Sequence, residues 1–325
     1  MSPLRGLRLG VCALALVLSA CAARPPVPAL PQGPSVELTQ TPFFPQDEYQ
    51  CGPAALATVL VASGVKVTPE ALVSQVYVPA RRGSLQAEIT ATTRRHERVP
   101  VVLPPRLDAI TDALQGGQPV LVLLNLGIDA VPVWHYAVVV GFDPSQDTLL
   151  LRSGREARHT MRRSRFDAAW ARAERWAVTV TDLETLPPRV TVEAWVAAVA
   201  PFESRQQYGL AERGYRSAIR RWPQSALPQS AMGNVRAGQQ DWAGAVEAYT
   251  AALSHAQTPI LLNNRAYALL QLQCADAARA DLHRARALQP PAALTALLDG
   301  TERALAAMPA PGACPAAVER SLGAQ

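Results

Sequence analysis

The pattern of apolar and polar positions along this 325-residue chain changes near Pro187-Pro188. Before that point, apolar segments with helical spacing come first and short β-rich runs follow. One helix is expected directly after Cys51, because Pro53 suits a first helical turn, residues 54–61 are apolar, and Ser63-Gly64 ends the pattern. Helices before a sheet predict an α+β domain, which we assign to residues 40–184.

The β-rich runs predict an antiparallel sheet. They span residues 99–103, 120–126, 134–142, 148–152 and 176–181. The segment Asp-Pro-Ser-Gln-Asp at 143–147 has the composition of a turn, so the third and fourth runs are expected to form a hairpin.

Beyond a linker at 185–199, the chain is almost entirely helical in pattern, up to a short tail at 311–325. One trio of positions recurs at intervals of 34 and 33 residues, as Ala211, Tyr215 and Ala218, then Ala245, Tyr249 and Ala252, then Ala278, Leu282 and Ala285. This spacing resembles the tetratricopeptide repeat, which implies an all-α array over residues 200–310 that can dock a protein partner. The first unit lacks an evident leading helix, and an irregular helical bundle is the alternative.

The N-terminus has the features of an export signal. Arg5 and Arg8 precede a short apolar run, which ends in Leu-Ser-Ala-Cys at 18–21. Residues 1–20 therefore resemble a bacterial lipoprotein signal peptide, which implies lipidation of Cys21 and membrane contact through the lipid. A proline-rich tether follows at 21–39. The expected location is the cell envelope, at the outer membrane facing the periplasm, and an ordinary secretory signal is the alternative.

The amino-acid composition excludes some classes of protein and some kinds of partner. Apolar residues make up 49% of the chain, which allows packed cores and excludes a disordered protein. The net charge of +5 comes almost wholly from arginine and is spread along the chain, so nucleic acid is not an expected partner. The sequence contains neither a zinc-like spacing of Cys and His nor a glycine-rich phosphate loop, so no metal or cofactor is expected.

The cysteines separate by position. The chain has five, of which Cys12 leaves with the signal and Cys21 is the lipid site. An exported protein meets an oxidising compartment, so Cys274 and Cys314 in the helical part are a possible disulfide. Cys51 then remains as a free thiol.

The surroundings of Cys51 favour nucleophilic chemistry. At the first turn of a helix, unpaired backbone N–H groups and the positive end of the helix dipole favour the thiolate. Gly52 leaves room for a substrate carbonyl, and the Cys51 N–H can help to hold an oxyanion. A side-chain amide upstream would be the second donor, and Gln46 is preferred over Gln50 for this role.

The segments 46–55 and 134–142 resemble the bacteriocin-processing (double-glycine leader) cysteine peptidases and their stand-alone relatives. The first contains Gln46 and Cys51-Gly-Pro, and the second begins Trp-His-Tyr with His135 at its centre. The resemblance covers about residues 40–180 and implies a papain-like fold, with Cys51 on a helix as nucleophile and His135 on a strand as base. It also implies a peptide or protein substrate, cut after small residues such as paired glycines. Gln46 stands five residues before the cysteine, whereas that family usually has six.

The family's acidic third residue is missing from its expected place. Asp143 and Asp147 lie at the hairpin tip, about 26 Å from His135 at roughly 3.3 Å per residue. If Phe142 faces Thr148 across the turn, the position of the acid is taken by Ser153. A hydroxyl can orient an imidazole without adding charge. Glu156 could reach the histidine only if the hairpin shifts by one residue.

These observations predict an envelope-anchored cysteine peptidase with a helical docking region. Two other classes stay open at this stage. The first is an inactive peptidase-like scaffold or binding lipoprotein, which the missing acid favours. The second is a thiol-dependent acyl or amide transferase, which would use the same cysteine.

Overall fold

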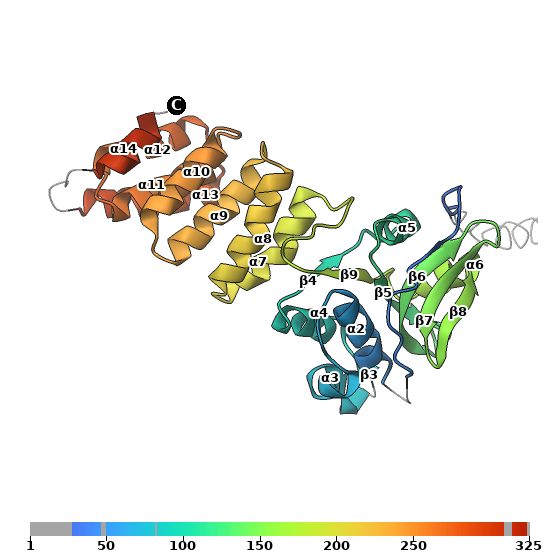
Figure 1. Cartoon of the computed structure of the whole chain (residues 1–325). Helices are drawn as coiled ribbons and strands as arrows, with labels where there is room; N and C mark the ends of the chain where they lie inside the picture. Colours follow the sequence, from blue (N-terminus) through green and yellow to red (C-terminus); the bar gives the residue numbers. More distant parts are fainter. Residues whose placement is uncertain (1–27, 47–49, 82, 309–313, 324–325) are drawn as a thin grey trace, which may run out of the picture.

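A computed structural model of the chain describes residues 28–46, 50–81, 83–308 and 314–323. It contains a sheet domain followed by a stack of helices (Figure 1). The predicted signal peptide and the lipidation residue Cys21 lie outside the described residues. Within those residues, no helix combines the length and the apolar character that a membrane span requires.

The sheet is antiparallel throughout, as the alternating runs predicted. Its strands are ordered β4-β9-β5-β6-β7-β8, and β1 pairs with β6 as a short addition. The bounds are β1 (Val36–Glu37), β4 (Val99–Val102), β5 (Val120–Asn125), β6 (Trp134–Asp143), β7 (Thr148–Ser153), β8 (Glu156–Arg162) and β9 (Ala177–Thr181).

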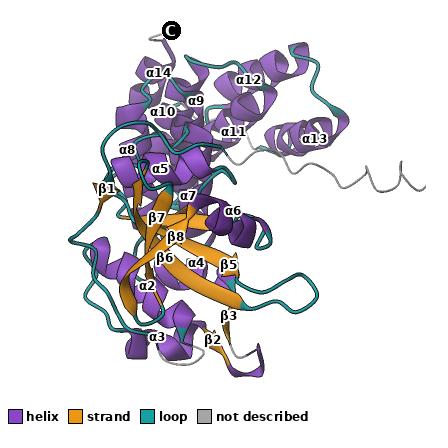
Figure 2. Cartoon of the chain, turned by 90° about the vertical axis from the view of Figure 1, so that its right-hand side faces the viewer, coloured by secondary structure: helices purple, strands orange, loops and turns teal. Residues whose placement is uncertain are grey.

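Helices cover both faces of this sheet (Figure 2). One face packs against α2 (Cys51–Ala62), α3 (Pro69–Val76) and α4 (Gln86–Arg95), through a buried cluster that includes Leu56, Leu72 and Ile89. The other face packs against α5 (Leu107–Gln115) and α6 (Arg163–Ala171), where Ile110 and Trp170 are buried. Burial on both faces explains why β5 is apolar from Val120 to Leu124, before it ends at Asn125.

A small hairpin crosses the start of α2. It consists of β2 (Tyr77–Val78) and β3 (Gly83–Ser84), with the 3₁₀ turn η1 (Pro79–Arg81) between them. Ser84 belongs to this hairpin rather than capping the next helix, which begins at Gln86 after the N-cap Leu85. The hairpin therefore brings Arg81 and Ser84 beside the nucleophile segment.

The helical part begins earlier than expected. Its helices are α7 (Val192–Ser204), α8 (Tyr208–Arg221), α9 (Ala226–Gly238), α10 (Trp242–Leu253), α11 (Pro259–Gln271), α12 (Ala275–Ala287), α13 (Ala292–Ala306) and α14 (Ala316–Gly323). The expected linker 185–199 is corrected over its second half, because α7 starts at Val192. α7 is also the leading helix that the first unit was expected to lack, and it is tied to α8 by a 2.8 Å hydrogen bond from Trp195 Nε1 to the Gly214 carbonyl.

The recurring small residues lie where the helices meet. Ala211, Ala245 and Ala278 are each fully buried, which allows neighbouring helices to approach closely. The successive helices are therefore packed through the positions that the sequence pattern selected. Their assignment to the tetratricopeptide class stays a prediction. The expected tail 311–325 contains α14, whose Val318 packs into the same apolar cluster as α11 and α12.

The helices are docked onto one edge of the sheet. Val99 and Val101 of the edge strand β4 share a buried cluster with Trp195, Val199 and Phe202 of α7. Figure 1 shows α7 against β4 at this junction. The contact covers an edge that would otherwise be open to pairing with another chain, and it fixes the array to the sheet domain.

A buried ion pair joins α11 to α12. Arg265 donates to both carboxylate oxygens of Asp281 at 2.8 and 2.9 Å, and the two side chains are only 2% and 1% exposed. Arg265 also donates to the Thr250 hydroxyl of α10 at 2.9 Å. The pair thus connects three successive helices.

The substitution Asp281→Ala is expected to lower the free energy of unfolding of the array by about 3–5 kcal/mol, because it leaves a buried guanidinium without its carboxylate. Asp276→Ala, on the exposed face of the same helix, should leave that free energy nearly unchanged. Urea unfolding followed by circular dichroism measures both. Equal effects of the two substitutions would contradict the buried-pair interpretation.

Candidate active site

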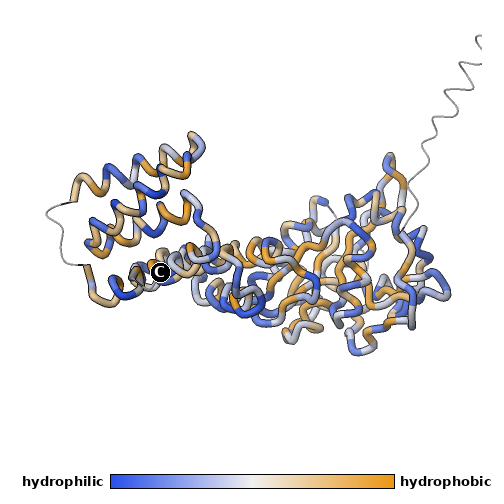
Figure 3. Tube along the Cα trace, turned by 90° about the horizontal axis from the view of Figure 1, so that it is seen from above, coloured by the Kyte–Doolittle hydropathy of each residue, from blue (hydrophilic) through white to orange (hydrophobic). Residues whose placement is uncertain are grey.

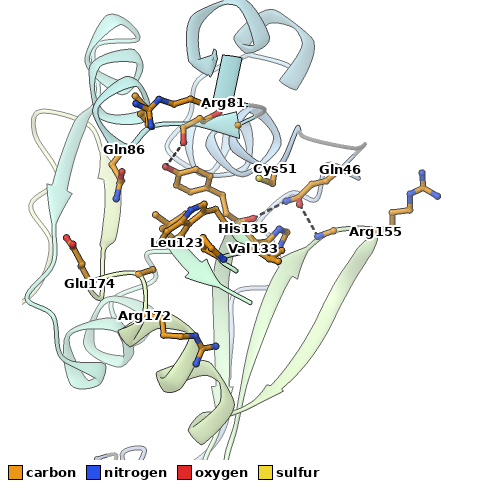
Figure 4. Close-up of a pocket in the computed structure, with 18 residues that line it drawn as sticks. Gln46, Cys51, Arg81, Gln86, Leu123, Val133, His135, Arg155, Arg172 and Glu174 are labelled. Carbon is orange, nitrogen blue, oxygen red and sulfur yellow. Dashed lines mark hydrogen bonds between the residues drawn. The ribbon is translucent and has the colours of Figure 1, made fainter. Parts of the chain in front are cut away.

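A cavity of about 1100 Å³ opens where the start of α2, the start of β6 and the β7–β8 turn meet. Gln46, Cys51 and His135 all line it, and Figure 4 shows the three side chains gathered at its centre. Ser153 precedes Gly154, which also lines the cavity. The structure therefore brings together the four residues that the sequence analysis selected.

Cys51 is the first residue of α2 and is half-buried. Gly52 is required behind it, because a Cβ at that position would lie 2.1 Å from Ser84 Oγ. Burial raises the pKa of the Cys51 thiol above its ordinary value, and the backbone N–H of Tyr136 opposes this rise most. Desolvation therefore opposes the helix-start N–H groups and is the larger of the two effects on the pKa of Cys51.

His135 is the second residue of β6 and is oriented by a hydroxyl. Its Nε2 lies 2.9 Å from Ser153 Oγ. Burial, together with a smaller effect of the nearby charge of His159, lowers the pKa of His135 to about 4. The imidazole is therefore neutral near pH 7 and can accept a proton. With Nε2 on Ser153, Nδ1 is the nitrogen left for the Cys51 sulfur.

A bulge in the β6–β7 hairpin sets the position of Ser153. Next to the turn, Asp143 pairs with Thr148, one residue away from the expected Phe142–Thr148 pairing. The register then shifts between Val139 and Gly141, and beyond this bulge Val138 pairs with Arg152. The Val138–Arg152 pair follows the same register as the expected Phe142–Thr148 pairing. The one-residue shift at the turn is cancelled by the one-residue shift at the bulge.

Gln46 is held at both ends of its side-chain amide. Its Oε1 accepts from the Gly154 N–H at 3.1 Å, and its Nε2 donates to the Tyr136 carbonyl at 3.4 Å. Its backbone N–H also donates to the Gly154 carbonyl at 2.9 Å. An amide carries two N–H donors, so one remains available beside the sulfur. Gln46 consequently ties the loop before α2 to the residues that follow His135 and Ser153.

Other candidates from the sequence lie elsewhere. Gln50 is the N-cap residue of α2 and is not part of the cavity lining. Glu156 contacts Nδ1 of His159 at 3.1 Å, rather than His135. Asp143 and Asp147 are at the far hairpin tip, where Asp147 pairs with Arg163.

The remaining cysteines lie in the helical part. The Cys274 and Cys314 sulfurs are joined in a disulfide that links the start of α12 to the segment before α14. Cys51 is the free cysteine among the described residues. In the same residues, no group of His, Cys, Asp and Glu is arranged to hold a metal ion.

Two contributions to the site were missed in the sequence. The Tyr136 backbone acts on Cys51 and Gln46. Tyr136 also lines the cavity, and its hydroxyl donates to the Ser84 carbonyl at 3.2 Å. The role of the Tyr136 backbone could have been predicted from the strand. Tyr136 directly follows His135, so its backbone groups lie next to the same site. The β2–β3 hairpin had no such signal, since its strands are two residues long.

Replacing Ser153 tests the orientation of His135. Ser153→Asp should raise the pKa of His135 from about 4 towards its ordinary value, because a carboxylate beside Nε2 favours the imidazolium. Activity would then be lost at a higher pH as the solution is acidified. Ser153→Ala should keep the pKa low and slow proton transfer about tenfold through lost orientation. NMR titration of the imidazole measures the pKa.

Ser164→Asp is the matched control, since Ser164 is exposed in the first turn of α6. It should leave the titration of His135 unchanged. An equal shift in both aspartate variants would show that general charge, and not contact with Nε2, controls the imidazole.

Gln46→Ala separates a positioning role from an oxyanion role. Alkylation of sulfur by iodoacetamide forms no oxyanion, so a residue that only holds an oxyanion does not affect its rate. Because Gln46 also fixes Gly154 and Tyr136, the substitution should slow alkylation of Cys51 about threefold or more. Gln115→Ala, at the exposed end of α5, is the control. An unchanged alkylation rate would restrict Gln46 to the oxyanion.

The sheet domain is similar to known proteins. Residues 38–178 match the model of the Peptidase_C39 like family. One similar solved structure is a Bacillus anthracis protein described as a C39-like peptidase, with 16% identity and a TM-score of 0.40 over 46% of this chain and 98% of that chain. Another is the peptidase domain of Streptococcus ComA, described as a bi-functional ABC transporter involved in a quorum sensing pathway. It has 19% identity and a TM-score of 0.36 over 44% of this chain and 99% of that chain. No curated protein matches the chain. The sheet domain, with its Cys51 helix and His135 strand, is thus a papain-like domain similar to the Peptidase_C39 like family.

Proposed function

We propose that this chain is a cysteine peptidase that hydrolyses peptide bonds, with Cys51 as nucleophile and His135 as base. One observation carries the proposal. The 2.9 Å contact of His135 Nε2 with Ser153 leaves Nδ1 to serve the sulfur in the cavity that Cys51 and His135 share. The match to the peptidase family over residues 38–178 supports it.

Acylation begins from a neutral pair. As the Cys51 sulfur attacks the substrate carbonyl carbon, its proton moves to Nδ1 of His135, and the carbonyl oxygen becomes an oxyanion. The Cys51 backbone N–H and the second N–H of Gln46 are the proposed donors to that oxygen. The imidazolium then gives its proton to the leaving amine, the C–N bond breaks, and a thioester remains.

Deacylation returns the site to its starting state. His135 takes a proton from a water molecule, whose oxygen attacks the thioester carbon. The C–S bond breaks, the carboxylic acid leaves, and the proton on Nδ1 returns to the sulfur. Ser153 contacts Nε2 throughout, so the same tautomer serves both halves of the reaction.

Two alternatives are favoured by specific features. A scaffold without activity is favoured by the neutral third residue and by burial, which raises the pKa of the thiol and lowers that of the imidazole. A thiol-dependent acyl or amide transferase would form the same thioester and pass it to an amine. The products distinguish these alternatives from hydrolysis: a scaffold forms none, a transferase forms an amide, and a peptidase forms a free acid.

We further propose an envelope location, with the chain anchored through a lipid on Cys21. The support is the order of charge, apolar run and small residues before that cysteine. The helical array would present a protein partner or substrate beside the membrane. Its fixed junction with β4 supports a docking role, because a bound partner would be held at a set orientation to the cavity.

The peptidase proposal predicts that His135 controls the reactivity of Cys51. Iodoacetamide at neutral pH should label Cys51 about tenfold faster in the wild type than in His135→Ala, as measured by peptide mapping. His283→Ala, an exposed histidine of α12, is the control and should label like the wild type. Hydrolysis of fluorescent casein should be lost in Cys51→Ala.

Equal labelling in wild type and His135→Ala would favour the scaffold. Amide products formed with an added amine, in place of free acid, would favour the transferase.

A further inference from the structure

Charged side chains surround the reacting pair. Arg81 ends η1, Arg155 stands in the β7–β8 turn, and Arg172 follows α6, so three separate elements each place an arginine in the cavity lining. Figure 4 shows them on different sides of Cys51. Among the described residues of that lining, Glu174 is the acidic one.

Two of these cations lack an acidic partner within the described chain. Arg81 makes no ion pair with a carboxylate in those residues. Arg172 donates from Nε and Nη2 to the Asn125 carbonyl at 3.3 and 2.8 Å, which is a neutral acceptor. By contrast, Arg175 just outside the cavity is paired with Asp167 at 2.9 Å. Within the described residues, the guanidinium groups of Arg81 and Arg172 therefore face the cavity without a carboxylate partner.

The cavity can present this charge to a polypeptide. A volume of about 1100 Å³ accommodates several residues of an extended peptide. Arg81 and Arg155 both line the cavity and are drawn on opposite sides of Cys51 in Figure 4, so an extended chain that fills the cavity can contact both side chains. The planar guanidinium matches a carboxylate with two parallel hydrogen bonds, which makes it selective for Asp and Glu.

We propose that the substrate is an acidic peptide segment, with Asp or Glu side chains flanking the bond that Cys51 attacks and bound by Arg81, Arg155 and Arg172. The proposal names the substrate class of the site and rests on the proposed function for the cleavage step only. Recognition itself requires the arginines and not the thiol, so binding and hydrolysis can be measured separately.

Binding is measured on the full chain carrying Cys51→Ala, which cannot consume the probe. Two fluorescein-labelled peptides share one framework around a central Ala-Gly and differ only in Glu or Gln on both sides of it. Fluorescence anisotropy should show about fivefold tighter binding of the Glu peptide at low salt, and the preference should fade at high salt.

Arg81→Gln and Arg155→Gln, added to Cys51→Ala, should each reduce the preference for the Glu peptide. Arg172 is left intact because it also supports the Asn125 backbone. Arg303→Gln, at an exposed arginine of α13, is the matched control and should retain the preference. Circular dichroism confirms that each variant is folded.

Equal affinity for the two peptides, or a preference that survives both arginine substitutions, would overturn the inference. In a separate measurement, the intact chain is given the Glu peptide and the Gln peptide, and cleavage of each is followed. Preferential binding without cleavage would retain the acidic-segment inference and reject the peptidase proposal. Cleavage of both peptides at equal rates and affinities would do the reverse.

Discussion

A single hydrogen bond decides what the cavity can do. The contact between His135 Nε2 and Ser153 Oγ leaves Nδ1 as the imidazole nitrogen that can serve the sulfur. If Nε2 carries the ring proton, Nδ1 has a lone pair and can accept the proton of Cys51. If the tautomer were reversed, the same residues at the same distances would be unable to start the reaction. The hairpin bulge, the tie through Gln46 and the packing of α2 all serve this arrangement.

The neutral partner changes how the pair works. A carboxylate beside Nε2 would stabilise an imidazolium, whereas a serine hydroxyl orients the ring without supplying charge. Burial then dominates, so the pKa of His135 falls to about 4 and that of Cys51 rises. Burial thus favours the neutral forms, thiol and imidazole, over an ion pair. Proton transfer must accompany attack on the carbonyl, when the oxyanion donors offset the developing charge.

Much of the site could be predicted from the sequence because its signals are local. Cys51 at a helix start and His135 at the start of an apolar strand both came from short patterns. Ser153 was placed by assuming a pairing offset between β6 and β7 that is wrong next to the turn. The bulge near Val140 restores this offset at Ser153, and the sequence contains no pattern that predicts the bulge. Strand β8 was missed because it is a polar, mostly exposed edge strand without apolar alternation. The opposing effect of burial on the Cys51 thiol was not predicted, because burial by segments distant in the sequence cannot be inferred from one helix.

The most direct test of this account is the tautomer of His135. NMR of the chain labelled with ¹⁵N-histidine, with the His135 signals identified by their loss in His135→Gln, distinguishes a protonated ring nitrogen from a bare one. The account predicts a neutral imidazole near pH 7 with the proton on Nε2 and none on Nδ1. A proton on Nδ1, or an imidazolium at that pH, would contradict it.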